Sequence, residues 1–374
     1  MTASIWRIAI ISGMLCGLAT ASPSFASAAD ARPQAESAPC AQTPADGGEP
    51  CASEAEAKER ENIAKFTAAY VLPLADELAG AGDARNLALA ASLRRYALKA
   101  VPAHAQDDDA RSIEWQRRAL AQMRDDPLVA LLVLADRESP QDPIGAQALQ
   151  RWRDATPQNL VPLLLAETDG DEILRAARTM RRFDHGFIDL LRLVLDAVDR
   201  HPPSAQALSW LRAAGGRDGE IAALTIGTNL SMAIMPRFSP IMSACIKQVS
   251  PAQSERWRDC RHVGALLAES SDTAIAAMIG WSILRYAPDA PTRANAKKQR
   301  RQLRWRLRQW ETLRECAAPG TDAPRFAAIL RAHPELGEEA LMREHLLAAG
   351  MVLEPPADWS DERVSEPACS ADAR

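Results

Sequence analysis

The sequence predicts an all-α protein of stacked antiparallel helical hairpins, an irregular α-solenoid stapled by disulfides. The first supporting observation is composition. The 374 residues include only 18 Gly and 3 Tyr, whereas sheet proteins need more Gly at turns and more Tyr in strands. The second is a recurring pair, a helix-capping residue followed by proline, which separates apolar blocks. With 47% apolar and 25% charged residues, the chain has the composition of an ordinary folded protein.

The first residues have the pattern of a secretory signal. Arg7 is the only charge in residues 1–28, and an apolar run extends from Ile8 to Ala21. Ala26-Ser27-Ala28 then forms a small-residue site, with cleavage expected after Ala28. A membrane anchor needs about 20 apolar residues, and this run is shorter. We therefore expect a signal peptide and a periplasmic or secreted product, and no later stretch is apolar and long enough to predict an integral membrane protein.

Charge and residue type along the remaining chain limit its partners and its organisation. The formal net charge is −5, and loss of Arg7 with the signal peptide changes it to −6. Nucleic-acid binding needs a net basic surface, so we expect no nucleic-acid partner. Pro and acidic residues are concentrated near both ends. We therefore expect a flexible segment over 29–53, a helical repeat domain over 54–350 and a C-terminal tail over 351–374.

Six cysteines follow the signal peptide, and an even number in an exported chain predicts disulfides. They are Cys40, Cys51, Cys245, Cys260, Cys316 and Cys369. Of the 15 possible pairing schemes, sequential pairing lets Cys245–Cys260 staple a helical hairpin and lets Cys369 hold the tail through Cys316. A closed loop of about 15 residues is worth about 3 kcal/mol. No pair has the close spacing of a zinc site, so we expect no metal.

Four capping residues precede proline in the helical region. They are found at Asp126-Pro127, Asp142-Pro143, Thr156-Pro157 and Ser250-Pro251. The cap oxygen accepts an N–H of the first helical turn, and proline at the first position loses nothing because its missing N–H has no partner there. The first three starts are about 15 residues apart, which predicts helices of about 11–13 residues. Further along, small residues at 276, 277 and 280 predict close packing between helices.

Residues 113–214 resemble divergent tetratricopeptide-type hairpins. The matching residues are Ala119-Leu120 with Asp126-Pro127, and Ala148-Leu149 with Thr156-Pro157-Gln158-Asn159. The proline interval is 30 residues instead of the family's 34, and the family's Trp, Leu-Gly and Tyr positions are absent. The resemblance implies a concave groove that binds a partner protein or peptide. An irregular helical domain without a groove is the alternative.

Residues 293–315 carry nine cations against two acids and predict a basic amphipathic helix. Leu303, Leu307 and Trp310 form its apolar stripe, and Trp305 lies off that stripe as a packing residue or an exposed anchor. The candidate partner-binding residues are Lys297, Lys298, Arg300, Arg301, Arg304 and Arg308. Such a helix can bind a protein or an anionic envelope component. The alternative is a solvated face neutralised by the protein's own carboxylates, including those of residues 54–61.

No catalytic or cofactor-binding motif is recognisable. No two histidines are spaced for a zinc helix, and Glu269-Ser270 lacks the Gly-Leu-Met-Gln segment that follows the Glu-Ser pair of peptidoglycan-cleaving enzymes. We therefore predict a non-catalytic protein-binding or scaffolding solenoid of the periplasm, without cofactor. The alternative is an all-helical hydrolase or lyase with a site assembled from distant residues. Two converging carboxylates in a deep pocket, or an Asp184–His185 pair in a cleft, would favour that alternative.

Overall fold

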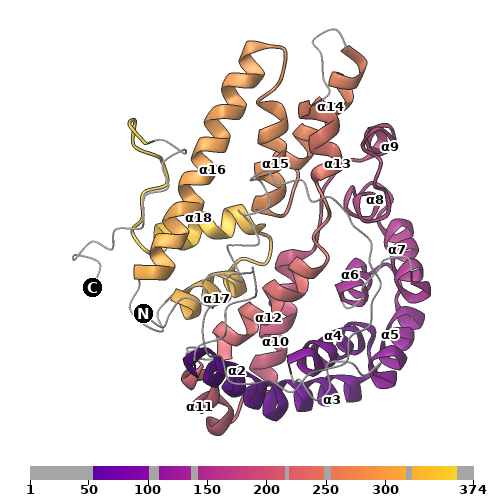
Figure 1. Ribbon diagram of the computed structural model, residues 1–374, viewed down its shortest axis with the longest axis vertical. Helices are drawn as coiled ribbons and strands as arrows, with labels where there is room; N and C mark the ends of the chain where they lie inside the picture. Colours follow the sequence, from indigo (N-terminus) through magenta and orange to yellow (C-terminus); the bar gives the residue numbers. More distant parts are fainter. Residues whose placement is uncertain are drawn as a thin grey trace, which may run out of the picture.

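The computed structural model describes residues 54–100, 109–135, 142–214, 219–247, 254–316 and 322–359 (Figure 1). Within these ranges every regular element is a helix, and β-type pairing is limited to two isolated bridges. The predicted all-α class is therefore confirmed. The predicted signal peptide, the 29–53 segment and the end of the tail lie outside the described residues. So do Cys40, Cys51, Cys369 and the side chain of Cys316.

The first half of the domain is an arc of helices that rises from the bottom of Figure 1 along its right side. It comprises α2 (Glu54–Phe66), the π-helical turn η2 (Thr67–Val71), α3 (Leu72–Ala81), α4 (Ala84–Ala100), α5 (Ala110–Gln122), α6 (Pro127–Ala135), α7 (Pro143–Ala155), α8 (Val161–Ala166) and α9 (Gly170–Ala176). Successive helices pack on one another, α3 on α4, α4 on α5 and α6 on α7. Helix α6 is apolar all round, and residues 128–134 are buried in it, as expected of a helix with no polar face.

The second half continues inside the arc and then above and to the left of it in Figure 1. It comprises η4 (Ala177–Thr179), α10 (Phe187–Arg200), α11 (Ala205–Ala213), α12 (Gly219–Ala233), α13 (Ser239–Met242), η5 (Ser243–Lys247), α14 (Ser254–Glu269), α15 (Ala274–Leu284), α16 (Ala290–Cys316), α17 (Asp322–Ala332) and α18 (Glu338–Ala348). Helices far apart in the chain also meet, α2 with α11 and α12 with both α6 and α17. No helix in the described ranges combines the length and the apolar character that crossing a bilayer requires. The solenoid arrangement itself stays a prediction.

Two of the predicted proline caps are confirmed. Asp126 accepts a hydrogen bond from the backbone N–H of Leu128 at the start of α6, at 3.2 Å. Asp142 accepts from the backbone N–H groups of Ile144 and Gly145 at the start of α7, at 3.0 and 3.1 Å. The aspartate satisfies first-turn donors that have no partner within the helix, so the local sequence alone determines these two boundaries.

The predicted helix start at Thr156-Pro157 is wrong. The Thr156 hydroxyl donates to the Trp152 carbonyl, 3.0 Å away, and so ends α7 instead of beginning the next helix. Helix α8 begins only at Val161, whose N–H donates to the side-chain oxygen of Asn159. Residues 157–160 form a turn instead of the first helical turn, and α8 and α9 are 6 and 7 residues long, shorter than the predicted helices. The Ser250-Pro251 start lies outside the described residues.

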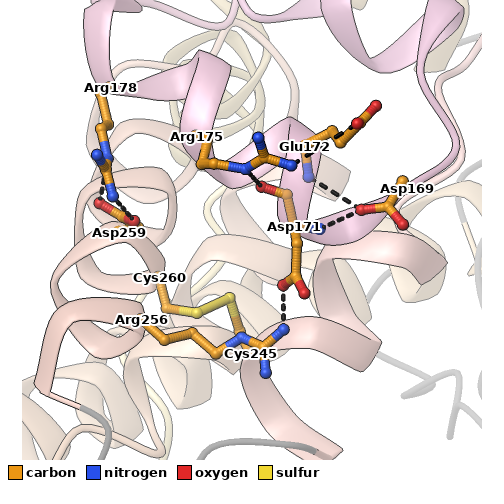
Figure 2. A network of polar contacts seen from close by, with 9 residues as sticks. All are labelled: Asp169, Asp171, Glu172, Arg175, Arg178, Cys245, Arg256, Asp259 and Cys260. Atoms are coloured by element: carbon orange, nitrogen blue, oxygen red, sulfur yellow. Dashed lines mark hydrogen bonds and ion pairs between the residues drawn. A yellow bond between two sulfur atoms is a disulfide. The ribbon is translucent and has the colours of Figure 1, made fainter.

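The predicted disulfide between Cys245 and Cys260 is present, with Cα atoms 5.6 Å apart. It joins η5 to α14, and Figure 2 shows that salt bridges surround it. Arg178 forms a two-pronged salt bridge with Asp259, at 2.9 and 2.7 Å, and Arg256 pairs with Asp171 of α9. These contacts all tie the η5, η4 and α9 region to α14, and the disulfide is their covalent member.

Removing this disulfide should lower the free energy of unfolding by about 2–3 kcal/mol, because the unfolded chain regains the freedom of a loop of about 15 residues. The variant is Cys245→Ser/Cys260→Ser, measured by urea unfolding under non-reducing conditions. Arg256→Ala is the control, since it removes a neighbouring surface ion pair and should cost less than about 1 kcal/mol. A double serine variant as stable as the control would contradict the prediction.

Candidate functional site

Helix α16 is the long helix that the basic sequence predicted, and its apolar stripe is confirmed. Leu303 is only 1% exposed, and Leu307 and Trp310 pack beside it in the same core cluster. This stripe faces α15 and α18, which both pack on α16. The cations of α16 lie in different surroundings, and these surroundings decide what each can bind.

The six predicted partner-binding cations are placed differently from one another. Lys297 and Lys298 are exposed, and Arg304 is half-buried. Arg300 donates to the Ser282 hydroxyl of α15, at 3.1 Å, and Arg308 pairs with Glu311 one turn later, at 3.2 Å. The sixth, Arg301, contacts a different part of the chain.

Carboxylates of the protein also pair with this helix. Arg306, buried in α16, pairs with Glu339 of α18. Glu61, from the stretch expected to neutralise α16, instead pairs with Lys65 of its own helix at 2.6 Å.

Arg301 contacts the segment that follows α18. The end of α18 sets the direction in which this segment leaves the helix. Gly350 has φ +73°, a left-handed conformation that glycine adopts without strain. Its N–H donates to the Leu347 carbonyl and the Met351 N–H donates to the Leu346 carbonyl, both at 2.9 Å. This pair of bonds is a Schellman motif, which ends a helix and redirects the chain. We call the residues that follow, Met351–Trp359, the C-terminal strap.

The C-terminal strap lies along α16, next to that helix at the left of Figure 1. The Trp305 indole N–H donates to the Val352 carbonyl at 2.8 Å. The Gln302 amide donates to the Glu354 carboxylate at 2.6 Å. The strap thus runs antiparallel to α16, from the level of Trp305 toward the N-terminal end of that helix.

Arg301 makes the densest contact with the strap. Its guanidinium donates to the carbonyl oxygens of Pro356, of Ala357 at 3.3 Å and of Trp359 at 3.0 and 3.2 Å. The same group lies over the Trp359 ring, 5.7 Å from its centroid, in a cation–π contact. Trp305 meets the Trp359 ring edge-on, with centroids 5.5 Å apart. This face of α16 therefore holds main-chain carbonyls and one indole, which is a way to bind polypeptide.

Two further carboxylates, those of Asp272 and Glu338, lie at the starts of other helices. Asp272 accepts the backbone N–H groups of His185 at 2.8 Å, Gly186 at 2.7 Å and Phe187 at 3.3 Å, and so caps α10. Glu338 accepts the backbone N–H of Ala274 at 2.6 Å, at the start of α15. The Glu338 N–H in turn donates to the Asp272 carbonyl at 3.2 Å. Each carboxylate is thus used as a cap on a helix from another part of the chain.

Burial shifts the pKa values of Asp272, Glu338 and the neighbouring His185. Burial raises the pKa of Asp272 to about 6 and that of Glu338 to about 7, and the Asp272 charge adds to the shift at Glu338. Burial lowers the pKa of His185 to about 4. The His185 ring contacts the buried Ser231 hydroxyl at 3.2 Å, whereas the Asp184 carboxylate pairs with Arg182 at 3.6 Å. The hypothetical Asp184–His185 catalytic pair is therefore not formed by these contacts.

Glu338→Gln should make the protein less sensitive to pH. The pKa of Glu338 is higher in the folded state than its ordinary value of 4.5, so the native protein gains stability as the pH falls from about 7 to 4.5. Glutamine keeps the acceptor for Ala274 without the charge. We expect the variant to exceed the wild type by about 1–2 kcal/mol at pH 8 and to match it at pH 4.5. Urea titrations across this range are the measurement, with the exposed Glu344→Gln on the same helix as control. Parallel pH curves for Glu338→Gln and wild type would contradict the prediction.

A polar pair joins α17 to α18. The fully buried His345 of α18 contacts the Asp322 carboxylate of α17, Nε2 to Oδ1 at 2.6 Å, and its ring packs against Trp310 and Phe326. This cluster binds α16, α17 and α18 into one unit. In the described part of the chain no three His, Cys, Asp or Glu side chains gather as metal ligands.

Sequence reasoning missed the strap and the buried carboxylates as sites. A signal for the strap existed, because Gly350 follows an apolar helix end and Trp359 is a lone aromatic among Pro and acidic residues. Asp272 and Glu338 had no such signal. Comparison with known proteins finds no family model, no curated protein and no solved structure that matches this chain.

Proposed function

We propose that the chain is an exported, non-catalytic protein that binds extended polypeptide segments on the Arg301–Trp305 face of α16. The observation that carries the proposal is the C-terminal strap, a segment in non-helical conformation that this face already holds. Arg301 and Trp305 contact its carbonyl oxygens, which every polypeptide offers. Trp359 is the strap side chain whose contacts need an aromatic ring, since it packs under the Arg301 guanidinium and edge-on with the Trp305 ring.

Other observations support an interaction role outside the cytoplasm. The Cys245–Cys260 disulfide is typical of oxidising compartments and agrees with the predicted signal peptide. Antiparallel helix neighbours and the resemblance to tetratricopeptide-type hairpins agree with a scaffold for partner proteins. The buried carboxylates support a structural role more than a catalytic one, because both oxygens of Asp272 and one oxygen of Glu338 accept backbone N–H groups at helix starts.

The proposal is tested with the strap sequence as a separate peptide. The probe is a fluorescein-labelled peptide of residues 350–359, Gly-Met-Val-Leu-Glu-Pro-Pro-Ala-Asp-Trp. The protein is the full chain with Leu353→Asp/Trp359→Ala, which removes two of the strap side chains that pack on the protein. We call it the released variant. Fluorescence anisotropy should give saturable binding with a Kd of about 10–100 μM, typical of a few hydrogen bonds and one indole.

Arg301→Ala in the released variant should weaken this binding at least about 10-fold, because one guanidinium serves three carbonyls and the indole. The matched control is Arg118→Ala in the same background, an exposed arginine of α5, and this helix lies at the right of Figure 1, away from α16. Far-UV circular dichroism checks that the variants fold alike. Absence of saturable binding to the released variant, or equal effects of the two arginine substitutions, would overturn the proposal.

A further inference from the structure

We propose that the C-terminal strap is a built-in competitor, and that the partner is an acidic, extended segment that presents a tryptophan to Arg301 and Trp305 in its place. This inference rests on the proposed function. It adds to that function a regulatory element and the chemistry of the partner. Three features of the strap carry it, and each concerns how the strap is attached.

The first feature is that the strap can leave without opening the core. Val352 is 63% exposed, and residues 354 and 356–358 are exposed as well. Only Met351 and Leu353 join the apolar cluster beneath. The Schellman stop uses only the N–H groups of Gly350 and Met351, so the helix end persists when residues 352–359 of the strap are displaced.

The second feature is the tether. Because the strap follows α18 directly, its effective concentration at the α16 face is in the millimolar range, as for any short linker. A free peptide of the same sequence must compete with this concentration. If the face is open in a tenth of the molecules or fewer, the apparent Kd of a partner rises about 10-fold or more. Only a partner with higher affinity than the strap, or one at high concentration, therefore displaces it.

The third feature is the charge of the two surfaces. The strap carries Glu354, which accepts the Gln302 amide, and the exposed Asp358. The helix offers Arg301 and, one turn nearer its N-terminus, the exposed Lys297 and Lys298. A partner that follows the same path meets the same cations, so acidic residues favour it and basic residues oppose it. Trp359 is the aromatic residue of the strap, and its indole contacts both Arg301 and Trp305.

The test compares the full-length wild type with the released variant, using the labelled peptide of residues 350–359. We expect the wild type to bind at least about 10-fold more weakly. We expect the peptide with Trp359→Ala to lose at least about 10-fold in affinity for the released variant, and the peptide with Glu354→Lys/Asp358→Lys at least about 3-fold at low salt. Arg118→Ala in the wild type should leave the peptide affinity unchanged.

The outcomes separate this inference from the proposed function. Equal affinities of wild type and released variant would overturn the strap as competitor while leaving the peptide site standing. Unchanged binding of the tryptophan-less or the basic peptide would overturn the stated partner chemistry. No binding to the released variant would overturn the proposed function, and this inference with it. A second release variant, Leu353→Asp alone, covers the case in which the double variant does not fold.

Discussion

Asp272→Ala is expected to lower the free energy of unfolding by about 4 kcal/mol at pH 7.5. At that pH the carboxylate is ionised, since its pKa is about 6, and it accepts three backbone N–H groups at the start of α10. Alanine leaves these donors without their acceptor, and each buried, unsatisfied donor costs about 1–3 kcal/mol. The helix also loses the negative charge that opposes the positive end of its dipole.

Urea unfolding followed by far-UV circular dichroism measures this effect. Asp272→Asn should lose about 2 kcal/mol, because its amide keeps one acceptor oxygen while its NH₂ group faces a backbone donor. Asp184→Ala is the control, a nearby acid whose surface pair with Arg182 should be worth less than about 1 kcal/mol. A loss below about 2 kcal/mol for Asp272→Ala would show that the cap is dispensable.

Gly280→Val is expected to destabilise the protein by a similar amount, about 4 kcal/mol. Even a Cβ atom at Gly280 would lie 2.4 Å from the backbone nitrogen of Ala268 and 2.6 Å from the carbonyl oxygen of Gly264. Both atoms belong to the backbone of α14 and cannot rotate away, so α14 and α15 must separate along their contact. The separation would also disturb the apolar packing between the two helices.

Chemical unfolding again provides the measurement, and the chain offers a matched control. Gly80 in α3 is also a helical glycine, but a Cβ there would meet no atom within 4 Å. Gly80→Val should therefore change stability by less than about 0.5 kcal/mol, as expected for an open surface site. If the two valine variants were equally stable, the close approach of α14 and α15 would not matter for stability.

The features that could be predicted are those whose causes lie within a few residues. The continuous apolar block at 128–134 follows a proline cap, which predicts a buried helix, and the structure confirms it. Asp142 before Pro143 caps its own helix through neighbours two and three residues away. Small residues around Gly280 predicted a close helix contact, which the distances to α14 confirm. Thr156 failed because its hydroxyl can serve either the end of one helix or the start of the next.

The contacts of the α16 face with the strap could not be predicted from neighbouring residues in the sequence. The basic, amphipathic character of α16 was readable, and Trp305 was recognised as lying off the apolar stripe. Nothing near Trp305 in the chain indicates that it donates to Val352, 47 residues later. The partners of Arg301 are main-chain carbonyls, which carry no sequence signal at all. The cations thus looked equivalent in the sequence and differ only in what the fold brings next to them.

The sequence alone determined the helical class, the starts of α6 and α7, the apolar stripe of α16 and the Cys245–Cys260 bridge, because short-range periodicity, caps and loop closure cause them. Only the tertiary structure decided that Asp272 caps a helix that begins more than 80 residues earlier, that Glu338 caps α15, and that the strap covers Arg301. Such contacts depend on which distant segments the packed core places side by side, and a one-dimensional pattern does not specify that geometry.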